Sequence, residues 1–223
     1  MSHEYCVELV PIFNHLPKES MALISKVAQH RTYKKDDYLF RADESGEALY
    51  IVHSGEVRLF HLTHEGDEQL LRVLYPGDFT GEWSLFNTVQ NDETFAKVTM
   101  DSEICVIPVD RFQEMLLDYP QVALKLLEEM SRRLSQSQEQ TIHIANRPIA
   151  KRLAWYLTSE IGPDRSTAKV HLPLSRKDLA TYLGTTPESI TRAFKQLEER
   201  GLIDQLSSEV IVVPVVDELR FYI

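Results

Sequence analysis

Three side chains in the C-terminal third of the chain have the chemistry to read base edges of DNA. Glu188, Thr191 and Arg192 are three and four residues apart, so a helix places them on one side within about one turn. A carboxylate accepts a hydrogen bond from cytosine N4, and a guanidinium donates two to guanine O6 and N7, each contact giving about 1–3 kcal/mol of base discrimination. The alternative interpretation of Glu188 and Arg192 is an i,i+4 charge pair on a solvated helix, which contributes only about 0.3 kcal/mol to helix stability.

Two helices with clear boundaries are predicted around these residues. The first takes Ser175 as its N-cap and stops at Gly184. The second takes Thr186 as its N-cap, has Pro187 at its first position and stops at Gly201. Four apolar residues at helical spacing give the second helix a side to bury: Ile190, Ala193, Phe194 and Leu197. This stretch therefore predicts a helix-turn-helix with one packed side and one free side.

These residues resemble the Crp/Fnr family of transcription regulators, and the resemblance extends over nearly all 223 residues. In that family the second helix opens with Glu, followed three and four residues later by a small residue and Arg. The sequence TPESITR supplies them as Glu188, Thr191 and Arg192, which the resemblance implies are base-reading. Pro187 stands where the catabolite-activator branch has a further base-reading Arg, so an Fnr-like palindromic TGA...TCA site in double-stranded DNA is expected.

The resemblance also implies contacts to the DNA backbone. The family alignment places Ser175, Arg176 and Ser189 at such positions, and Lys195 follows on the free side of the second helix. These contacts position a protein on DNA without specifying sequence. Contacts to RNA polymerase are implied by the family alone.

Charge is unevenly distributed along the chain. The whole sequence has 24 Lys and Arg against 34 Asp and Glu, a net charge of −10. Residues 146–223 have 11 basic and 10 acidic side chains, net +1, which leaves 13 and 24, net −11, in residues 1–145. A near-neutral DNA-binding part cannot depend on many phosphate contacts. Its affinity is therefore expected to depend on dimerisation and a few placed residues.

The first half of the chain has short β-rich runs separated by turns. Gly55, Gly66 and Gly77 are 11 residues apart, a hairpin-sized spacing that predicts an antiparallel β-roll or jelly roll. With the resemblance, the expected fold is α+β in three parts: a cyclic-nucleotide-binding-like β-roll after a helical lead-in (residues 1–108), a dimerisation helix (109–145) and a winged helix-turn-helix (146–223).

A long helical region is predicted from Asp110 to about Ala145. Its first turns are expected to lie on the chain's own β-roll. Six later residues alternate by three and four, as in a coiled-coil seam: Leu127, Met130, Leu134, Ser137, Thr141 and Ile144. This seam predicts a homodimer, because two recognition helices about 34 Å apart suit a palindromic site.

Cyclic AMP is not expected as the ligand of the β-roll. The family's cyclic-nucleotide members hold the phosphate with an Arg-Ser pair a few residues after the motif GE-x-x-L. The sequence GEWSLF matches that motif, but the pair falls on Asp92 and Glu93. Two carboxylates facing a phosphodiester repel it strongly in a pocket of low dielectric constant.

Two cysteines, Cys6 and Cys105, limit which signals the β-roll can sense. Cys105 stands where the oxygen-sensing Fnr branch has a distant cluster ligand, but Cys6 is alone where that branch has several. No iron–sulfur cluster is therefore expected, and no cofactor is predicted. The two-cysteine Flp subgroup, which the chain resembles most, implies a dithiol/disulfide switch. Two alternatives stay open: inert thiols in a regulator that responds to an unidentified small ligand, and ligation of metal or haem.

A metalloenzyme with a similar β-roll is the main rival. His53, His61, His64 and Glu65 supply ligand types, but such sites need two His one residue apart on a strand so that both rings face inward. His61 and His64 are three apart, so neither an enzyme nor a metal site is expected. The N-terminus lacks the basic and apolar regions of a leader, and no run of 18 apolar residues occurs. A cytoplasmic protein without membrane contact is predicted.

Overall fold

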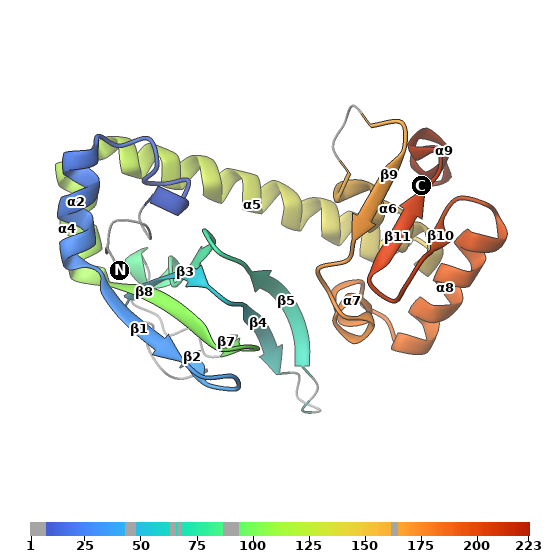
Figure 1. Ribbon diagram of the computed structural model, residues 1–223, viewed down its shortest axis with the longest axis horizontal. Coiled ribbons are helices and arrows are strands. Elements are labelled where there is room, and N and C mark those ends of the chain that lie inside the picture. Colours follow the sequence, from blue (N-terminus) through green and yellow to red (C-terminus); the bar gives the residue numbers. More distant parts are fainter. Residues whose placement is uncertain (1–7, 43–47, 63–65, 67, 87–93, 162–164) are drawn as a thin grey trace. The chain divides into compact units, whose positions relative to one another are not determined.

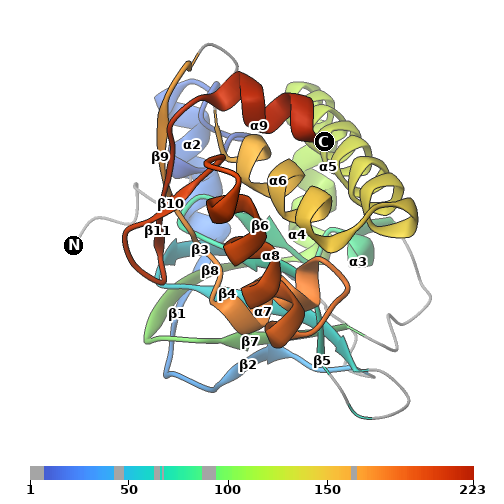
Figure 2. The ribbon, with the colours of Figure 1, turned by 90° about the vertical axis from the view of Figure 1, so that its right-hand side faces the viewer.

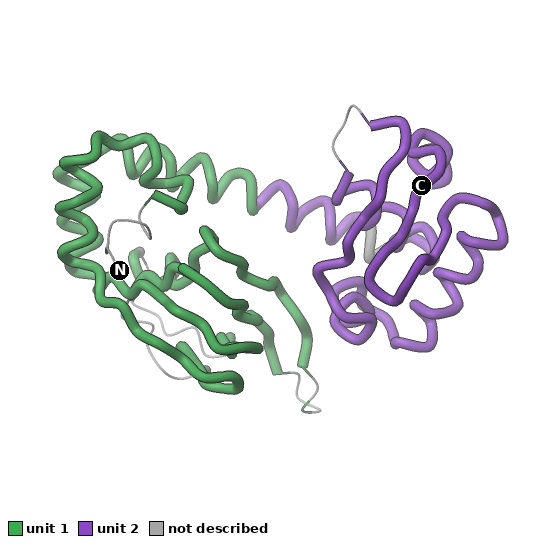
Figure 3. The backbone as a smooth tube through the Cα atoms, viewed as in Figure 1, with its two compact units in different colours: residues 1–133 green, residues 134–223 purple. Residues whose placement is uncertain are grey.

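The computed structural model of this protein has two compact units, residues 1–133 and residues 134–223 (Figure 3). The division falls within one helix, and each unit is described by itself. The structure describes the chain except for the following residues, drawn in grey in Figure 1: 1–7, 43–47, 63–65, 67, 87–93 and 162–164.

Unit 1 is built on two antiparallel four-stranded sheets, which form the predicted β-roll (Figure 1). One sheet has the strand order β1-β8-β3-β6, and the other has the order β2-β7-β4-β5. The strand bounds are β1 Gln29–Tyr33, β2 Tyr38–Phe40, β3 Ala48–Ser54, β4 Val57–Leu62, β5 Glu68–Leu74, β6 Phe79–Thr80, β7 Thr94–Val98 and β8 Ser102–Pro108.

Three successive turns of the roll contain glycine in a left-handed conformation. Gly55, Gly66 and Gly77 have φ angles of 94°, 87° and 94°, which residues with a side chain rarely adopt. They lie between β3 and β4, between β4 and β5, and between β5 and β6. Only the Gly66 turn closes a hairpin, because β4 and β5 pair with each other, whereas the Gly55 and Gly77 turns connect strands of different sheets. The turns predicted from the 11-residue spacing are therefore confirmed, but only one of them is a hairpin.

Strand β8 is buried on both faces and separates two hydrophobic cores. Because side chains alternate along a strand, Ile104 and Val106 join the core between the two sheets, whereas Cys105 and Ile107 join a second core on the opposite face. That second core, called the helix-side core below, also takes in residues from the N-terminal segment and the helices: Val10, Ile12, Phe13, Leu16, Ile24, Phe112, Met115, Val122 and Leu126.

The helical region predicted as one stretch is two helices. Helix α4 spans Val109–Asp118, and α5 spans Pro120–Asn146. Pro120 has no N–H to donate and its ring would clash with the preceding turn, so it can only begin a helix. The residue before it, Tyr119, leaves the helical conformation with φ −128° and ψ 75°. The other helices of unit 1 are α2 Lys18–Val27 and α3 Trp83–Phe86.

Unit 2 contains the predicted winged helix-turn-helix, in which α6, α7 and α8 pack together (Figure 2). The wing is the β10–β11 hairpin of the sheet β10-β11-β9. Ser207 closes its turn by accepting hydrogen bonds from the amides of Glu209 and Val210, at 3.2 and 3.1 Å. The element bounds are α6 Ile149–Ser159, β9 Ala168–His171, α7 Arg176–Tyr182, α8 Pro187–Glu199, β10 Asp204–Gln205, β11 Val210–Val213 and α9 Val216–Tyr222. Within the described ranges, no helix is long and apolar enough to cross a membrane.

Candidate nucleic-acid interface

Both helices of the helix-turn-helix begin as the sequence predicts. The hydroxyl oxygen of Ser175 accepts a hydrogen bond from the amide of Asp178 at 3.1 Å, and the hydroxyl donates to the Asp178 carboxylate at 2.7 Å. The hydroxyl oxygen of Thr186 accepts from the amide of Ser189 at 3.3 Å, which caps α8. Gly184 between the helices has a φ of 64°. The caps and the turn are therefore confirmed.

Helix α8 has one buried side and one exposed side. Its buried side, at most 3% exposed, consists of Ile190, Ala193, Phe194 and Leu197. Its exposed side contains Glu188, Thr191, Arg192 and Lys195. Packing against α6 and α7 thus leaves the predicted base-reading residues free to meet a ligand.

Glu188 and Arg192 are not bonded to each other in this structure. Arg192 Nη2 instead donates to the hydroxyl oxygen of Ser189 at 3.0 Å. A hydrogen bond from the amide of Glu188 itself and one from Thr186 hold the pKa of the Glu188 carboxyl below its ordinary value. The hydroxyl of Thr191 donates to the backbone of its own helix at 2.9 Å. The exposed row thus offers an ionised acceptor and a guanidinium donor one turn apart.

Three of the four predicted backbone-contacting residues lie at the surface or at helix starts. Lys195 has 76% of its side chain exposed and its Nζ is 3.7 Å from a carboxylate oxygen of Glu199. The hydroxyls of Ser175 and Ser189 are already used in the hydrogen bonds at the starts of α7 and α8. Lys195 is therefore the residue of this group that is best placed to reach a phosphate.

Arg176, the fourth predicted backbone contact, turns toward the interior of unit 2. Its guanidinium carbon is 3.4 Å from the centroid of the Phe194 ring, and its Nη2 donates to Gln205 Oε1 at 3.0 Å. The backbone and side-chain amides of Gln205 in turn donate to the Glu198 carboxylate, each at 3.0 Å. The sequence analysis missed Gln205 and Glu198, because no spacing rule links a wing residue to a helix end.

Comparison with known proteins identifies the family of this chain. Residues 30–119 match the cyclic nucleotide-binding domain, and residues 151–222 match the Crp-like helix-turn-helix domain. The protein named "Probable transcriptional regulator flp" of Lacticaseibacillus casei is 33% identical over 217 residues, which cover 97% of each chain. The chain belongs to the Crp/Fnr family of transcription regulators.

Two further similar proteins agree with this assignment. "Transcriptional activator protein Anr" of Pseudomonas protegens is 26% identical over 196 residues, covering 86% of this chain and 80% of that protein. The structure of FixK2 from Bradyrhizobium japonicum aligns with a TM-score of 0.72 at 26% identity, over 87% of this chain and 96% of that one. The relatives are transcription regulators, so this chain is a DNA-binding regulator and not an enzyme.

The two described histidines of the rival metal site lie on different strands. His53 lies on β3 and His61 on β4, in different sheets. His64 and Glu65 lie outside the described residues. Among the residues that the structure describes, no group of three or more His, Cys, Asp or Glu could hold a metal ion.

Cys105 lies in a row of polar side chains on the helix-side face of the first sheet. It is fully buried and disulfide-bonded, whereas Cys6 lies outside the described residues. Its Sγ is 3.6 Å from Nδ1 of His30, its cross-strand partner on β1. The ring centroids of His30 and His53 are 6.4 Å apart, and Nε2 of His53 is 3.8 Å from Glu103 Oε2.

An ionic cluster links the β-roll to the first part of α5. Arg133 Nη1 donates to Glu82 at 2.6 Å and its Nε donates to Glu129 at 2.8 Å, with all three side chains at most 15% exposed. Its guanidinium also lies 4.1 Å from the centroid of the Phe79 ring. Arg72 donates to the Phe79 carbonyl at 2.9 Å, and burial next to Arg133 lowers its pKa to about 10. Asp92 and Glu93, on which the argument against cyclic AMP depends, lie outside the described residues.

The predicted dimer seam on α5 is partly displaced in the structure. Leu127 and Leu134 are 64% and 60% exposed, as a seam requires, and Leu124 is 68% exposed. Met130, however, packs partly against the helix-side core. Of the remaining seam residues, Ser137 and Thr141 are exposed, and the side chain of Ile144 is outside the described part. The exposed apolar stripe therefore includes Leu124, which the sequence analysis missed. It does not include Met130, which packs against the helix-side core.

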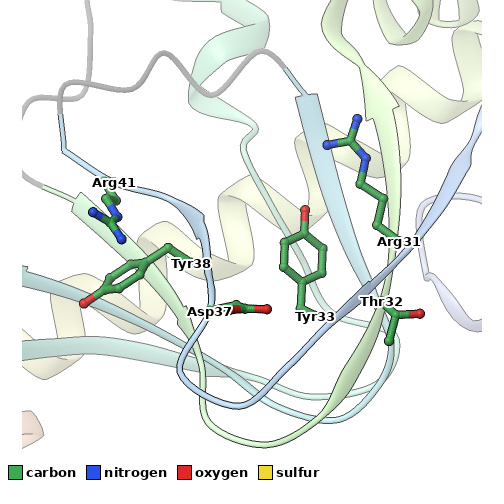
Figure 4. Close-up of a pocket in the computed structure, with 6 residues that line it drawn as sticks. All are labelled: Arg31, Thr32, Tyr33, Asp37, Tyr38 and Arg41. Carbon is green, nitrogen blue, oxygen red and sulfur yellow. The ribbon is translucent and has the colours of Figure 1, made fainter.

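An open hollow of about 670 Å³ lies beside strands β1 and β2 (Figure 4). In it the guanidinium of Arg41 lies 4.4 Å from the centroid of the Tyr38 ring. The other lining residues are Arg31, Thr32, Tyr33 and Asp37. The sequence analysis did not identify this hollow, because its residues come from two strands of different sheets and the segments next to β2, and no motif links them.

Proposed function

We propose that this Crp/Fnr regulator binds, as a homodimer, a palindromic DNA site with TGA...TCA half-sites. The observation that carries this proposal is the exposed row of Glu188, Thr191 and Arg192 on a helix capped and packed as a recognition helix. Carboxylate and guanidinium groups suit the major-groove edges of cytosine and guanine. RNA polymerase is the further partner that the family implies. A cytoplasmic location is part of the proposal, because a regulator needs access to DNA.

The proposed homodimer is supported by the exposed leucines of α5. Leu124, Leu127 and Leu134 each expose at least 60% of their surface, which is costly for a helix without a partner. Leu127 and Leu134 are seven residues apart, the repeat of a coiled coil. A second copy of α5 is the partner that pairs two recognition helices for a palindrome.

A mobility-shift assay tests the proposed site. One duplex contains the TGA...TCA palindrome, a second has one half-site scrambled, and a third has both scrambled. We expect the palindrome to bind at least tenfold more tightly than the half-site duplex. Equal affinity for all three duplexes would contradict sequence-specific dimeric binding.

The signal in this proposal is oxidation of Cys6 and Cys105 to a disulfide. Cys105 is disulfide-bonded, and Val10, Ile12 and Phe13 belong to the same helix-side core. Cys6 is four positions before Val10, a span of at most about 14 Å for an extended chain. Val122 and Leu126 of α5 also belong to that core, so a change in the N-terminal segment can alter how the roll packs on α5.

Affinity measurements under oxidant and reductant test this switch. We expect the affinity of the unmodified protein for the palindrome to differ between the two conditions, whereas the Cys6→Ser and Cys105→Ser variants keep one value. If the unmodified protein binds DNA equally well in both conditions, the cysteines are inert and the signal is another ligand.

No cofactor is part of the proposal, and cyclic AMP is not the proposed effector. The guanidinium of Arg133, on the roll side of α5, is already bonded to Glu82 and Glu129 and is therefore not free to bind a phosphate. Calorimetric titration with cyclic AMP is expected to give no heat of binding.

A further inference from the structure

His30 and Cys105 are the closest polar pair in the row on the helix-side face. They face each other in the register of β1 and β8, so backbone pairing fixes their distance. Both ring nitrogens of His30 lie near the sulfur, Nδ1 at 3.6 Å and Nε2 at 4.0 Å. Among the described residues, Cys105 from β8 and His53 from β3 border the His30 ring across the sheet, with Glu103 beyond His53.

The surroundings of Cys105 oppose a negative charge on its sulfur. The residue is 0% exposed, and its neighbours in the helix-side core are apolar. Burial in such surroundings disfavours a thiolate, whereas an adjacent protonated imidazole favours it. Imidazole is the side chain whose charge ordinarily changes between about pH 5 and 8. The charge of His30 therefore determines whether the thiolate of Cys105 is disfavoured by burial or favoured by the imidazole.

We propose that His30 is a positioning residue that sets the redox behaviour of Cys105 by stabilising its thiolate. A disulfide sulfur accepts only a weak hydrogen bond from an imidazole N–H of His30. A thiolate accepts a stronger, charge-assisted hydrogen bond from that N–H. The imidazole therefore stabilises the reduced state more than the oxidised state. The inference rests on the proposed Cys6/Cys105 switch and names the group that tunes it.

Reduction by a small thiol such as glutathione shows where His30 acts. A glutathione thiolate attacks the sulfur of Cys6, the S–S bond breaks, and its electron pair stays on Cys105 Sγ next to His30. A second glutathione thiolate attacks the mixed disulfide and releases the thiolate of Cys6. One proton from solvent completes the thiol of Cys6, a second protonates the imidazole of His30 beside the Cys105 thiolate, and two glutathione thiolates become one glutathione disulfide. A leaving thiolate of lower pKa departs faster, so His30 assists the first step.

Equilibration of the full-length protein in glutathione buffers at pH 7 measures the effect. After acid quenching and alkylation, mass spectrometry gives the fraction of dithiol. We expect His30→Gln to shift the equilibrium about tenfold toward the disulfide, which is a reduction potential lower by about 30 mV. The matched control is His61→Gln, which removes an imidazole from the other sheet and leaves the equilibrium unchanged.

A second measurement does not need the disulfide. In the Cys6→Ser variant, Cys105 is the remaining cysteine, and its thiolate is followed by absorbance at 240 nm against pH, with the double serine variant subtracted. We expect His30→Gln to move this titration to higher pH. An unchanged titration overturns the role of His30. If the unmodified protein forms no disulfide in any buffer, the proposed switch fails, and this titration still decides whether His30 tunes Cys105.

Discussion

The guanidinium carbon of Arg176 lies 3.4 Å from the centre of the Phe194 ring. The first residue of α7 therefore stacks on a buried residue of α8, and its hydrogen bond to Gln205 also connects it to the wing. Burial lowers the pKa of Arg176, and its Nη1 is buried without a hydrogen bond to any described residue. A guanidinium tolerates this position because it is planar and weakly hydrated.

Replacement of Arg176 by Lys is expected to lower the free energy of unfolding by about 1 kcal/mol. Lysine keeps the charge but loses the planar stack on Phe194. Thermal unfolding measures the loss, and Lys177→Arg, at an exposed neighbouring position, is the control. Unchanged stability together with a uniform loss of DNA affinity would show that Arg176 contacts phosphate, as the family alignment implies.

Arg192→Ala is expected to weaken binding to the palindrome by about 1–3 kcal/mol and to relax selectivity at one guanine, because a base contact is lost. The comparison variant is Lys195→Ala, which is expected to weaken binding evenly over all sequences and to reduce the slope of log K against log salt by about 1. Titrations of single-base variants of the site at several salt concentrations measure both effects. If Arg192→Ala weakens binding equally for all DNA sequences, Arg192 contacts the DNA backbone and not a base.

Leu134→Asp is expected to convert the protein to a monomer and to reduce affinity for the palindrome. An aspartate in an apolar seam must bury its charge or keep the two helices apart. Sedimentation velocity at micromolar concentration measures the oligomeric state. Gln136→Asp adds the same charge on α5 away from the exposed leucines and is expected to leave the dimer intact. A dimer that survives Leu134→Asp argues for a different interface.

Acid is expected to weaken the ionic cluster of unit 1. Burial raises the pKa of Glu129, but hydrogen bonds from Arg132 and Arg133 outweigh burial and bring it below the ordinary value of 4.5. Because the folded pKa is below the unfolded one, the stabilisation is present above about pH 4.5 and is lost as pH falls through the folded pKa.

Urea unfolding of Glu129→Gln tests this pH dependence. At pH 7 the variant is expected to be about 1.5 kcal/mol less stable than the unmodified protein, since it loses charged hydrogen bonds to two arginines. The difference is expected to shrink at pH 3.5. Glu128→Gln, which loses one exposed pair with Lys125, serves as the control. If the difference in unfolding free energy stays constant with pH, the pH dependence does not come from Glu129.

Local rules were sufficient to predict the helix-turn-helix. The caps at Ser175 and Thr186 and the turn at Gly184 could be predicted because each depends on residues within three or four positions of one another. The turns at the three roll glycines have the same local origin. Pro120 carried a local signal for the break between α4 and α5 that the helical periodicity obscured.

The sequence by itself determined the helix-turn-helix and the exposed row of α8, because these depend on local periodicity and capping. It also determined the family, through its resemblance to Crp/Fnr regulators. Only the tertiary structure decided that Arg176 points inward, that Met130 faces the chain's own core, and that His30 lies beside Cys105. Each of these contacts joins residues on different elements. Their distances depend on strand register and helix packing, which no spacing along the chain encodes.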